Sequence, residues 1–571
     1  MDTPRQVAEL PVAGPFDEQG RLLHDGDPAA QLALAVSVLE ARLAATGHPV
    51  TDLARIHIRT VNRRALDGVY DVLTERLEEL GADPLIDVTE ADRLGEPGTL
   101  LTLQATITLT KEPVMTTTST PSADTLRGLC GGRVLLPGDP GYDEARTPWN
   151  LAVDQRPAAV ALPRTAEEVA EVVRAAAAAG LRVAPQSTGH GAAGLKDTSL
   201  EDAVLVKLSE LTGVTVDAAA GTARVLGGTQ WAAVVGAAEP HGFTALHGSA
   251  PDVAVAGYVL GGGASFYGRQ HGLASGSVLA IELVTADGTL VRCDADHEPD
   301  LFWALRGGGG NFGVVVAIEL RLIPMADVFA GMLLWDRERA PEVCRAWAAW
   351  TKTVPESVTT SMRVMSFPPL PELPPFLSGR QLVIIDGAVL ESDERAAELL
   401  APLRALQPEM DTFARIPVTA MTEVHMDPPT PVGAVGEHAM LSDVTDETIE
   451  ALLGQVGPGT TSPLMFGEIR HLGGALGRPD PAAGAASHLA GDYLAFCVAP
   501  VMVPEMVAPG EAASREFVAA LQPWANGRSA LNFTDNPGRV ETGYDSDTLA
   551  RLREVRRSVD PTGVFVANHA L

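Results

Sequence analysis

The stretch LRVAPQSTGHGAAG, from Leu181 to Gly194, decides the fold of this chain, because it sets a single histidine in a loop of small residues. Small side chains let backbone amides approach an anion closely, and they leave His190 as the one strong nucleophile of the loop. The pattern therefore predicts a binding loop with a reactive imidazole. A plain turn with a solvated imidazole is the alternative that the same residues allow.

The residues before this loop indicate where it lies. Thr165 and Glu168 have the spacing of a capping box, and Ala166 to Ala179 is an Ala-rich segment that predicts a helix. Gly180 suits the C-cap of that helix, and Leu181 to Ala184 is typical of a strand. We therefore expect the histidine loop at the end of a strand.

Two further glycine clusters follow, HGSAPDVAVAGYVLGGGASFYGRQHGL (His247–Leu273) and DLFWALRGGGGNFGVVVAIELRL (Asp300–Leu322). The glycines from Gly308 onward match GxGxxG, but a dinucleotide fingerprint must follow a strand and open a helix. Here the predicted helix (Asp300–Leu305) comes first and the β-branched strand (Val314–Leu322) comes second. This order argues against an NAD-type Rossmann fold.

Together the three glycine clusters resemble the FAD-binding domain of the vanillyl-alcohol-oxidase superfamily, most closely that of the berberine-bridge-enzyme-like oxidases. The resemblance runs from about Arg133 to the C-terminus and includes PGDPGYDEARTPWN (Pro137–Asn150), RPAAVALPRTAEEV (Arg156–Val169), VLAIELVTADGTLV (Val278–Val291) and DPTGVFVANHAL (Asp560–Leu571). It implies an α+β fold, in which a two-subdomain FAD-binding fold of the PCMH type carries a substrate domain of antiparallel sheet plus helices.

The resemblance also implies FAD as the cofactor. The family's flavin-bearing histidine, linked to the 8α position of the flavin ring, corresponds to His190. Many members add a second link through a cysteine, but Ala250 stands at that position, so a single covalent attachment follows. The expected cofactor contacts are Pro185, Ser187, Thr188, Gly189, His190, Gly191, Gly194, Gly248, Ser249, Asp252, Val253, Gly257, Tyr258, Gly261, Gly262, Gly263, Gly268, Gly313, Val314 and Asn568.

The region from about Pro324 to Asn526 alternates helices with apolar strands, and in the resembled family it is the substrate domain. A flavin oxidase needs a donor carbon held over the flavin and a base that takes a proton from the donor. The family positions for that base are altered: Ala530 replaces a tyrosine in SALNFTD (Ser529–Asp535), which we expect to be a strand, and Cys497 and Ala264 occupy two others. The remaining catalytic candidates are Tyr258, Tyr267, His271, Glu468, His471, Tyr493 and Asn532, and a buried structural role is the alternative for each.

The first 112 residues form a separate α/β pattern. We expect helices at Asp27–Thr46 and Arg64–Leu80 and strands at Leu53–Val61 and Leu100–Leu109. The segment Gly26–Leu77 resembles the RidA (YjgF) family of trimeric proteins, some of which hydrolyse reactive imines. The family's substrate-binding arginine falls near Leu85, where no arginine is present, so a role in trimer formation or packing is favoured over an active deaminase.

These patterns predict five segments: a RidA-like domain (1–112), a linker (113–128), a PCMH-type FAD-binding domain (129–325), a substrate-binding domain (326–535) and a C-terminal berberine-like segment (536–571) that returns to the FAD-binding domain. The linker prediction rests on KEPVMTTTSTPSADT (Lys111–Thr125), whose Thr, Ser and Pro content cannot build a core.

Composition excludes several classes of function. The formal charge of −31 argues against nucleic acid and against an anionic membrane surface, and it means that local amides must hold an anionic cofactor. The 4 cysteines form no CxxC pair, so no metal site is expected. Neither a signal peptide nor an apolar run of ~18 residues is present, and we expect a cytoplasmic protein.

The sequence therefore predicts a FAD-dependent oxidoreductase that acts on a small or medium organic substrate, with oxygen as electron acceptor and the N-terminal domain as the source of a homo-oligomer. By family analogy alone, the substrate belongs to secondary metabolism. Two alternatives stay open. One is a bifunctional protein whose oxidase makes an imine that the N-terminal domain hydrolyses, and the other is a flavin-binding scaffold without catalysis.

Overall fold

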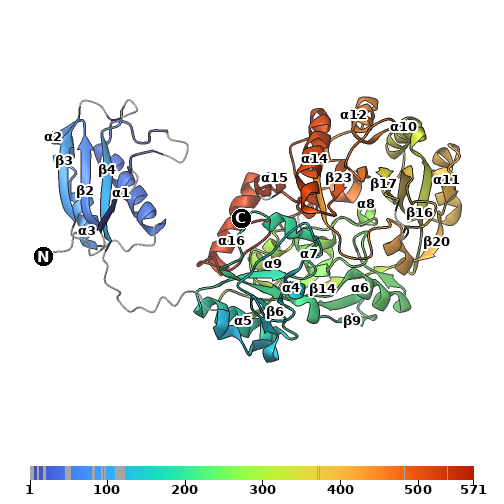
Figure 1. Cartoon of the computed structure of the whole chain (residues 1–571), viewed down its shortest axis with the longest axis horizontal. Helices are drawn as coiled ribbons and strands as arrows, with labels where there is room; N and C mark the ends of the chain where they lie inside the picture. The colour runs from blue at the N-terminus through green and yellow to red at the C-terminus, as the bar shows by residue number, and fades with distance from the viewer. Residues whose placement is uncertain are drawn as a thin grey trace. The chain divides into compact units, whose positions relative to one another are not determined.

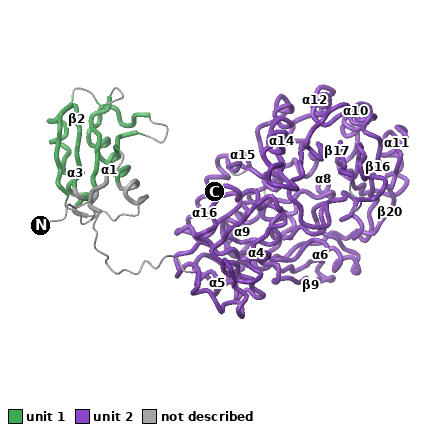
Figure 2. Tube along the Cα trace, in the orientation of Figure 1, with its two compact units in different colours: residues 1–118 green, residues 119–571 purple. Residues whose placement is uncertain are grey.

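The structure, a computed structural model, describes residues 6–9, 12–16, 21–45, 53–79, 84–91, 94, 98–109, 123–369, 371, 373–480, 482–536 and 538–571. The chain divides into two units, residues 1–118 and 119–571, shown in green and purple in Figure 2. Most of the predicted linker at 113–128 lies outside the described residues, which resume at Ala123. The finer domain boundaries stay predictions.

The first unit is a mixed sheet with helices packed on it, in the strand order β1-β4-β2-β3 (Figure 1). Its elements are β1 (Gln6–Glu9), α1 (Pro28–Ala45), β2 (Leu53–Thr60), α2 (Arg63–Asp67), α3 (Asp71–Glu79), β3 (Leu85–Glu90) and β4 (Leu101–Leu109). Strands β2 and β3 run parallel, whereas β1 and β2 pair with β4 in antiparallel fashion. The helix expected from Arg64 to Leu80 is broken in two at Gly68, since glycine is a poor residue for a helix interior.

The second unit begins with two sheets that share helix α5 (Ala166–Ala178) between them. The first sheet has the order β5-β6-β8-β7, with β5 (Val134–Leu135), β6 (Ala159–Ala161), β7 (Arg182–Gln186) and β8 (Ala203–Lys207). The second has the order β13-β12-β14-β10-β9, with β9 (Val214–Asp217), β10 (Thr222–Leu226), β12 (Val278–Val284), β13 (Leu290–Asp294) and β14 (Val314–Arg321). Helix α5 contacts β7 and β8 on one side and β12 and β14 on the other.

The start of α5 differs in one detail from the expected capping box. The Thr165 hydroxyl accepts a hydrogen bond from the Glu168 amide at 3.2 Å, as expected. The Glu168 carboxylate, however, accepts from the Arg164 amide and from the Arg133 guanidinium rather than from the Thr165 amide. The box is therefore half formed, because an ion pair attracts the carboxylate away from the cap. Gly180 follows the helix with a φ of +71°, which suits glycine.

The third sheet of the unit is antiparallel, in the order β19-β16-β18-β17-β22-β23-β21 with β20 beside β16. Its strands are β16 (Asp327–Asp336), β17 (Val358–Ser366), β18 (Gln381–Val389), β19 (Met410–Asp411), β20 (Ala414–Pro417), β21 (Ala434–Leu441), β22 (Phe466–His471) and β23 (Tyr493–Pro500). Helices α10 (Ala340–Thr351), α11 (Asp393–Arg404), α12 (Asp446–Val456) and α14 (Val507–Leu521) cover one face, and Trp347, Val383 and Phe517 lie in the core between them (Figure 1). These helices do not cover the opposite face, where Ala330 and Ala388 pack in the core cluster that holds Ile281 and Ile318 of the second sheet.

Short elements complete the second unit: α4 (Tyr142–Arg146), α6 (Trp231–Ala238), β11 (Phe243–Thr244), α7 (Val255–Leu260), α8 (Gly268–His271), α9 (Pro299–Leu305), β15 (Ile323–Pro324), α13 (Gly474–Gly477), α15 (Val540–Gly543) and α16 (Ser546–Val559). The C-terminal helix α16, red in Figure 1, packs against α9. After it, Phe565 forms a parallel bridge with Val183 of β7, so the tail reaches the strand that precedes the histidine loop.

The segment SALNFTD is not the strand that we expected from the sequence. Leu531–Phe533 form a single 3₁₀ turn. The side chain of Asn532 accepts a hydrogen bond from the Gly263 amide at 3.0 Å and donates one to the Tyr258 carbonyl at 3.2 Å. These bonds to another backbone replace the ladder that a strand would form.

Candidate functional site

The histidine loop lies directly after β7, and its conformation requires glycine at position 189. Gly189 has a φ of +89°, and a Cβ at this position would lie 2.7 Å from the Cβ of Pro148. The Trp149 amide donates a hydrogen bond to the Thr188 carbonyl at 3.0 Å, which holds the two segments together. The close approach of Pro148 and Trp149 therefore fixes the path of the loop.

His190 is held by an aromatic ring and a carboxylate. The Trp149 indole stacks on the imidazole with ring centroids 4.0 Å apart and an angle of 22° between the planes. The Nε2 atom of His190 lies 3.3 Å from Oδ1 of Asp252, and the Trp149 indole N–H donates to Oδ2 of the same carboxylate at 2.5 Å. Burial works to raise the pKa of Asp252, but the contacts with His190 and Trp149 outweigh it and lower that pKa.

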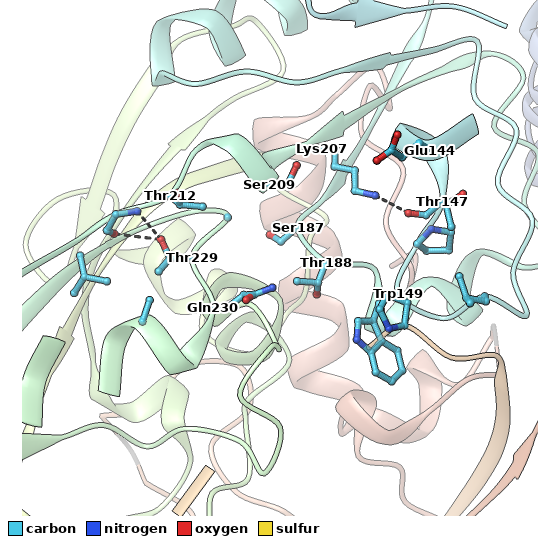
Figure 3. A pocket seen from close by; sticks show the side chains of 17 residues that line it. Glu144, Thr147, Trp149, Ser187, Thr188, Lys207, Ser209, Thr212, Thr229 and Gln230 are labelled. Carbon is cyan, nitrogen blue, oxygen red and sulfur yellow. Dashed lines mark hydrogen bonds between the residues drawn. The ribbon is translucent and has the colours of Figure 1, made fainter. Parts of the chain in front are cut away.

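A cavity of about 990 Å³ lies beside this loop, a size suited to a large ligand. Figure 3 shows Ser187, Thr188 and Trp149 at its wall together with Lys207, Ser209, Thr229 and Gln230. The Lys207 ammonium donates a hydrogen bond to the Thr147 carbonyl at 2.6 Å, and burial lowers the pKa of this lysine. Of the predicted cofactor contacts, Ser187 and Thr188 line this cavity. Lys207 was not predicted, although a lysine at the end of the apolar strand AVLVK is unusual.

The glycine triplet Gly261–Gly263 follows helix α7 and packs against Tyr258 and Asn532. Gly262 and Gly263 have φ values of +107° and +78°, and a Cβ on Gly263 would lie 2.4 Å from the Tyr258 ring. The Tyr258 hydroxyl is buried without a hydrogen-bond partner among the described residues, and burial raises its pKa. The structure thus brings together four of the predicted cofactor contacts and leaves the Tyr258 hydroxyl available for a ligand.

The C-terminal tail also reaches the histidine loop. The Asn568 side chain donates a hydrogen bond to the Gly191 carbonyl at 3.5 Å. A Cβ on Gly194 would lie 2.5 Å from the Asn568 carbonyl oxygen, so this glycine permits the tail to approach. Asn568 therefore lies beside the loop, and its contact with the cofactor stays a prediction.

The other predicted cofactor contacts are distributed around these groups. Pro185 lies in β7, Gly248, Ser249 and Val253 lie in the segment before α7, Gly257 lies in α7, Gly268 begins α8, and Gly313 and Val314 lie at the start of β14. Gly257 has no atom within 4 Å of an added Cβ, whereas a Cβ on Gly268 would contact Leu476 at 2.8 Å. Nothing local requires glycine at position 257.

A buried cluster of charged side chains lies on the face of the third sheet that the helices leave uncovered. Asp386 is fully buried between the Arg363 guanidinium, the Ser361 hydroxyl and Nδ1 of His425, the last at 2.9 Å. Burial alone would raise the pKa of Asp386, but the positive charge of Arg363 and the contact with His425 hold it well below its usual range. The imidazole of His425 lies 5.6 Å from the ring of Phe266, which follows the glycine triplet.

Glu468, one of the predicted catalytic candidates, belongs to this cluster. Its Oε1 atom lies 2.9 Å from the Arg470 Nε atom and 3.6 Å from Nε2 of His425. The carboxylate is fully buried, yet its oxygens accept no hydrogen bond of good geometry from the described residues. A second contact joins this region to the cofactor loops, because the Ser249 hydroxyl donates to Asp427 at 2.8 Å.

Four other candidates are not brought to this face. His471 and Tyr493 stack on each other with centroids 5.4 Å apart, and both rings contact Trp347 of α10 on the helix-covered face. Burial lowers the pKa of His471 to about 2. Tyr267 is fully buried against His247 in the core, and His271 is exposed at the end of α8.

Cys497 also faces the helices, since its sulfur contacts the Ser514 carbonyl of α14. Side chains alternate along a strand, so the face on which each residue lies follows from the register. The structure therefore leaves Glu468 as the predicted candidate on the uncovered face, with Asn532 and Tyr258 beside the glycine triplet. Sequence reasoning did not identify Trp149, Lys207, Asp386 or His425.

Among the described residues, no group of His, Cys, Asp and Glu side chains has the arrangement of a metal site. Within the same residues, no helix combines the length and apolar character that a membrane span requires. The four cysteines are buried and unpaired by disulfides.

Comparisons with known proteins agree on the class of cofactor. Residues 157–294 match the sequence family described as "FAD binding domain". The (R)-6-hydroxynicotine oxidase of Paenarthrobacter nicotinovorans is 35% identical over 205 residues, which are 36% of this chain and 44% of that enzyme. The chitooligosaccharide oxidase of Gibberella zeae is 29% identical over 289 residues, 50% of this chain and 54% of that enzyme. The matched segments thus span about half of each relative.

The fold has solved counterparts. The crystal structure of 6-hydroxy-D-nicotine oxidase from Arthrobacter nicotinovorans superposes with a TM-score of 0.67 at 24% identity, covering 76% of this chain and 96% of that one. The residues that follow the N-terminal unit therefore share the overall fold of this oxidase. The relatives are FAD-linked oxidases and oxidoreductases.

Proposed function

We propose that this chain is a FAD-dependent oxidase of a small or medium organic substrate. The observation that carries the proposal is the match of residues 157–294 to a FAD-binding domain, with the small-residue histidine loop and a cavity of about 990 Å³ inside the matched fold. A role in secondary metabolism rests on the resemblance alone.

The residues of the site fit this cofactor. The loop from Ser187 to Gly191 offers backbone amides to the cofactor, and a Cβ at position 189 would shift this loop. Lys207 supplies a positive charge at the cavity, in a chain whose formal charge is −31. The Tyr258 hydroxyl is buried without a hydrogen-bond partner among the described residues, so it is available to a ligand. Bound FAD would supply the acceptor for a hydride and would pass the electrons to oxygen.

We further propose that His190 bears the flavin covalently. It is the one imidazole in the loop, and Trp149 and Asp252 hold its ring in one orientation. Because Ala250 replaces the cysteine of the resembled family, a single link is expected.

The proton acceptor that we propose is Glu468. It is a buried carboxylate on the uncovered face of the third sheet, next to His425 and Arg470. Asp386 holds Nδ1 of His425, and Nε2 of the same ring lies 3.1 Å from Nη2 of Arg470 and 3.6 Å from Oε1 of Glu468. A proton taken from the substrate by Glu468 then has His425 as its next carrier.

The substrate class is open to a direct test. The names of the two relatives contain a nicotine derivative and an oligosaccharide, so both kinds of donor belong in the panel. The purified protein should be yellow, and one of these donors should bleach the flavin absorbance under anaerobic conditions. A flavin that no donor reduces would support the scaffold alternative, and a protein without flavin would contradict the proposal.

For the N-terminal unit we propose a role in assembly. Leu85, at the position of the resembled family's arginine, begins β3 and is 67% exposed. An exposed leucine suits a contact with another subunit better than the capture of a carboxylate.

A further inference from the structure

We infer that Asp252 is the positioning residue for flavin attachment: it orients His190 and takes the proton that the imidazole must lose when it bonds to the flavin. This inference rests on the proposed function, because it assumes that FAD occupies the loop.

Three side chains from three segments of the chain, Trp149, His190 and Asp252, meet at the histidine loop. Trp149 precedes the first sheet's core strands, whereas Asp252 lies in the second glycine cluster, 103 residues later. The carboxylate uses one oxygen for the Trp149 N–H and directs the other at Nε2 of His190, 3.3 Å away. The indole ring covers one face of the imidazole, so the ring cannot turn freely.

Two atoms of this arrangement lack a full set of hydrogen-bond partners. Both Nε2 of His190 and Oδ1 of Asp252 are buried, and neither makes a hydrogen bond of good geometry with the described residues. They face each other at slightly more than hydrogen-bond length. A small movement of the imidazole as it approaches a ligand would complete the bond.

The carboxylate of Asp252 is held in its ionised form. Burial would raise the pKa of Asp252, but the contacts with His190 and Trp149 lower it, so the group is ionised at neutral pH and can accept a proton. The ionisable group that acts on Asp252 is His190 itself. A buried carboxylate aimed at an imidazole nitrogen holds the proton on that nitrogen, which leaves the lone pair of the other nitrogen free to attack.

A bond forms between Nδ1 of His190 and the 8α carbon of FAD, and that carbon loses one hydrogen as a proton. His190 loses the proton on Nε2 to Asp252. The two electrons of the broken C–H bond remain with the flavin and pass to dioxygen, which with two protons gives hydrogen peroxide. Dioxygen is the acceptor that the proposed function already supplies.

The test uses the full-length chain produced with little flavin and then mixed with FAD. Bound FAD is measured after gel filtration, and covalent FAD is measured as flavin that stays in the acid precipitate over time. The variants are Asp252→Asn, Asp252→Glu and His190→Ala. The control is Asp217→Asn, which changes a carboxylate that caps the turn after β9.

We expect Asp252→Asn to bind FAD as wild type does but to form the acid-stable bond about a hundredfold more slowly. Asp252→Glu should recover a large part of the rate, Asp217→Asn should match wild type, and His190→Ala should form no acid-stable bond. Rescue by glutamate separates a chemical role from a merely structural one.

Three results would overturn the inference. They are an unchanged rate in Asp252→Asn, a loss of all FAD binding in both Asp252 variants, and a wild-type protein whose FAD is fully released by acid. The last result leaves the proposed oxidase function intact, since FAD can act without a covalent bond. Only a wild-type protein that binds no FAD in either assay would contradict that function.

Discussion

The indole ring of Trp149 lies nearly parallel to the imidazole of His190, with their centroids 4.0 Å apart. The same indole donates a hydrogen bond to Asp252, so a single side chain between β5 and β6 joins the histidine loop to the second glycine cluster. The site is thus held together by a residue that belongs to none of the three glycine clusters.

Replacing Trp149 by alanine should lower the flavin content of the purified protein, because both the stacking on His190 and the bond to Asp252 are lost. Trp149→Phe keeps a ring over the imidazole and loses only the N–H, so it should retain more flavin than Trp149→Ala. The ratio of flavin absorbance to protein absorbance measures this. Equal flavin content in the alanine variant and wild type would show that the indole does not support the site.

Gly189→Ala should prevent FAD binding, since its Cβ would lie 2.7 Å from Pro148 in a backbone with a φ of +89°. The matched control is Gly236→Ala in helix α6, where an added Cβ meets no atom within 4 Å. Gly236→Ala should retain FAD and should be slightly more stable, by up to about 1 kcal/mol. If both variants bind FAD equally, the loop does not have the role that we assign to it.

The sequence predicts the local parts of this architecture well. Helix α5 and strand β7 follow from an alanine-rich segment with its cap and from a short apolar run, both of which are determined by neighbours in the chain. The broken helix at Gly68 and the turn at Asn532 were missed. In the second case, side-chain bonds to Gly263 and Tyr258, far away in the sequence, override the strand pattern.

The catalytic candidates were harder to predict, because the third sheet is buried on both faces. An apolar pattern on both faces does not reveal which face is covered by helices, so His471 and Tyr493 could not be separated from Glu468 by sequence alone. His425 follows a short 3₁₀ segment and has no local signal, and it becomes notable only through its contact with Asp386 on β18.

Asp386→Asn should destabilise the second unit by about 3 to 5 kcal/mol, because it leaves the buried Arg363 without a counter-charge. The control is Asp202→Asn, which breaks the exposed pair with Arg182 and should cost under about 1 kcal/mol. Urea unfolding followed by fluorescence measures both free energies. If Asp386→Asn lowers the free energy of unfolding by less than Asp202→Asn does, the assignment of a buried ion pair is contradicted.

The same pair predicts an acid-sensitive fold. Since the pKa of Asp386 is lower in the folded protein than in the unfolded chain, its contribution to stability is present above about pH 4 and is lost as the pH falls below that value. The difference in unfolding free energy between wild type and Asp386→Asn should therefore shrink below about pH 4. If this difference in unfolding free energy does not change with pH, the pKa of Asp386 is not lowered in the folded protein.

The contribution of Asp535 to stability should depend on pH in the opposite direction. Burial, and then the negative charge of Glu437, raise its pKa to about 7. Below about pH 4 the carboxyl is protonated in both the folded and the unfolded state. As the pH rises from there toward 7, ionisation favours the unfolded chain and the free energy of unfolding falls. Because the side chain is only half-buried, we expect Asp535→Asn to stabilise the protein by roughly 1 kcal/mol at pH 8 and by less at pH 5. Thermal unfolding at the two pH values checks this.

Removing residues 1–118 should leave flavin binding unchanged and lower the oligomeric state. The remaining unit holds the matched FAD-binding residues and its own core, so it contains what the cofactor requires. Light scattering gives the mass, and the absorbance ratio gives the flavin content. A truncated protein with the original oligomeric state would show that the N-terminal unit does not direct assembly.

The most direct test of the central claim is anaerobic titration of the purified full-length protein with nicotine derivatives and oligosaccharides, followed through its flavin absorbance. The account predicts an oxidised-flavin spectrum, which one class of donor bleaches. Oxygen should then restore the spectrum with release of hydrogen peroxide. In the Glu468→Gln variant the same donor should bleach the flavin far more slowly. A protein that binds no flavin, even when FAD is supplied in excess, would contradict the account.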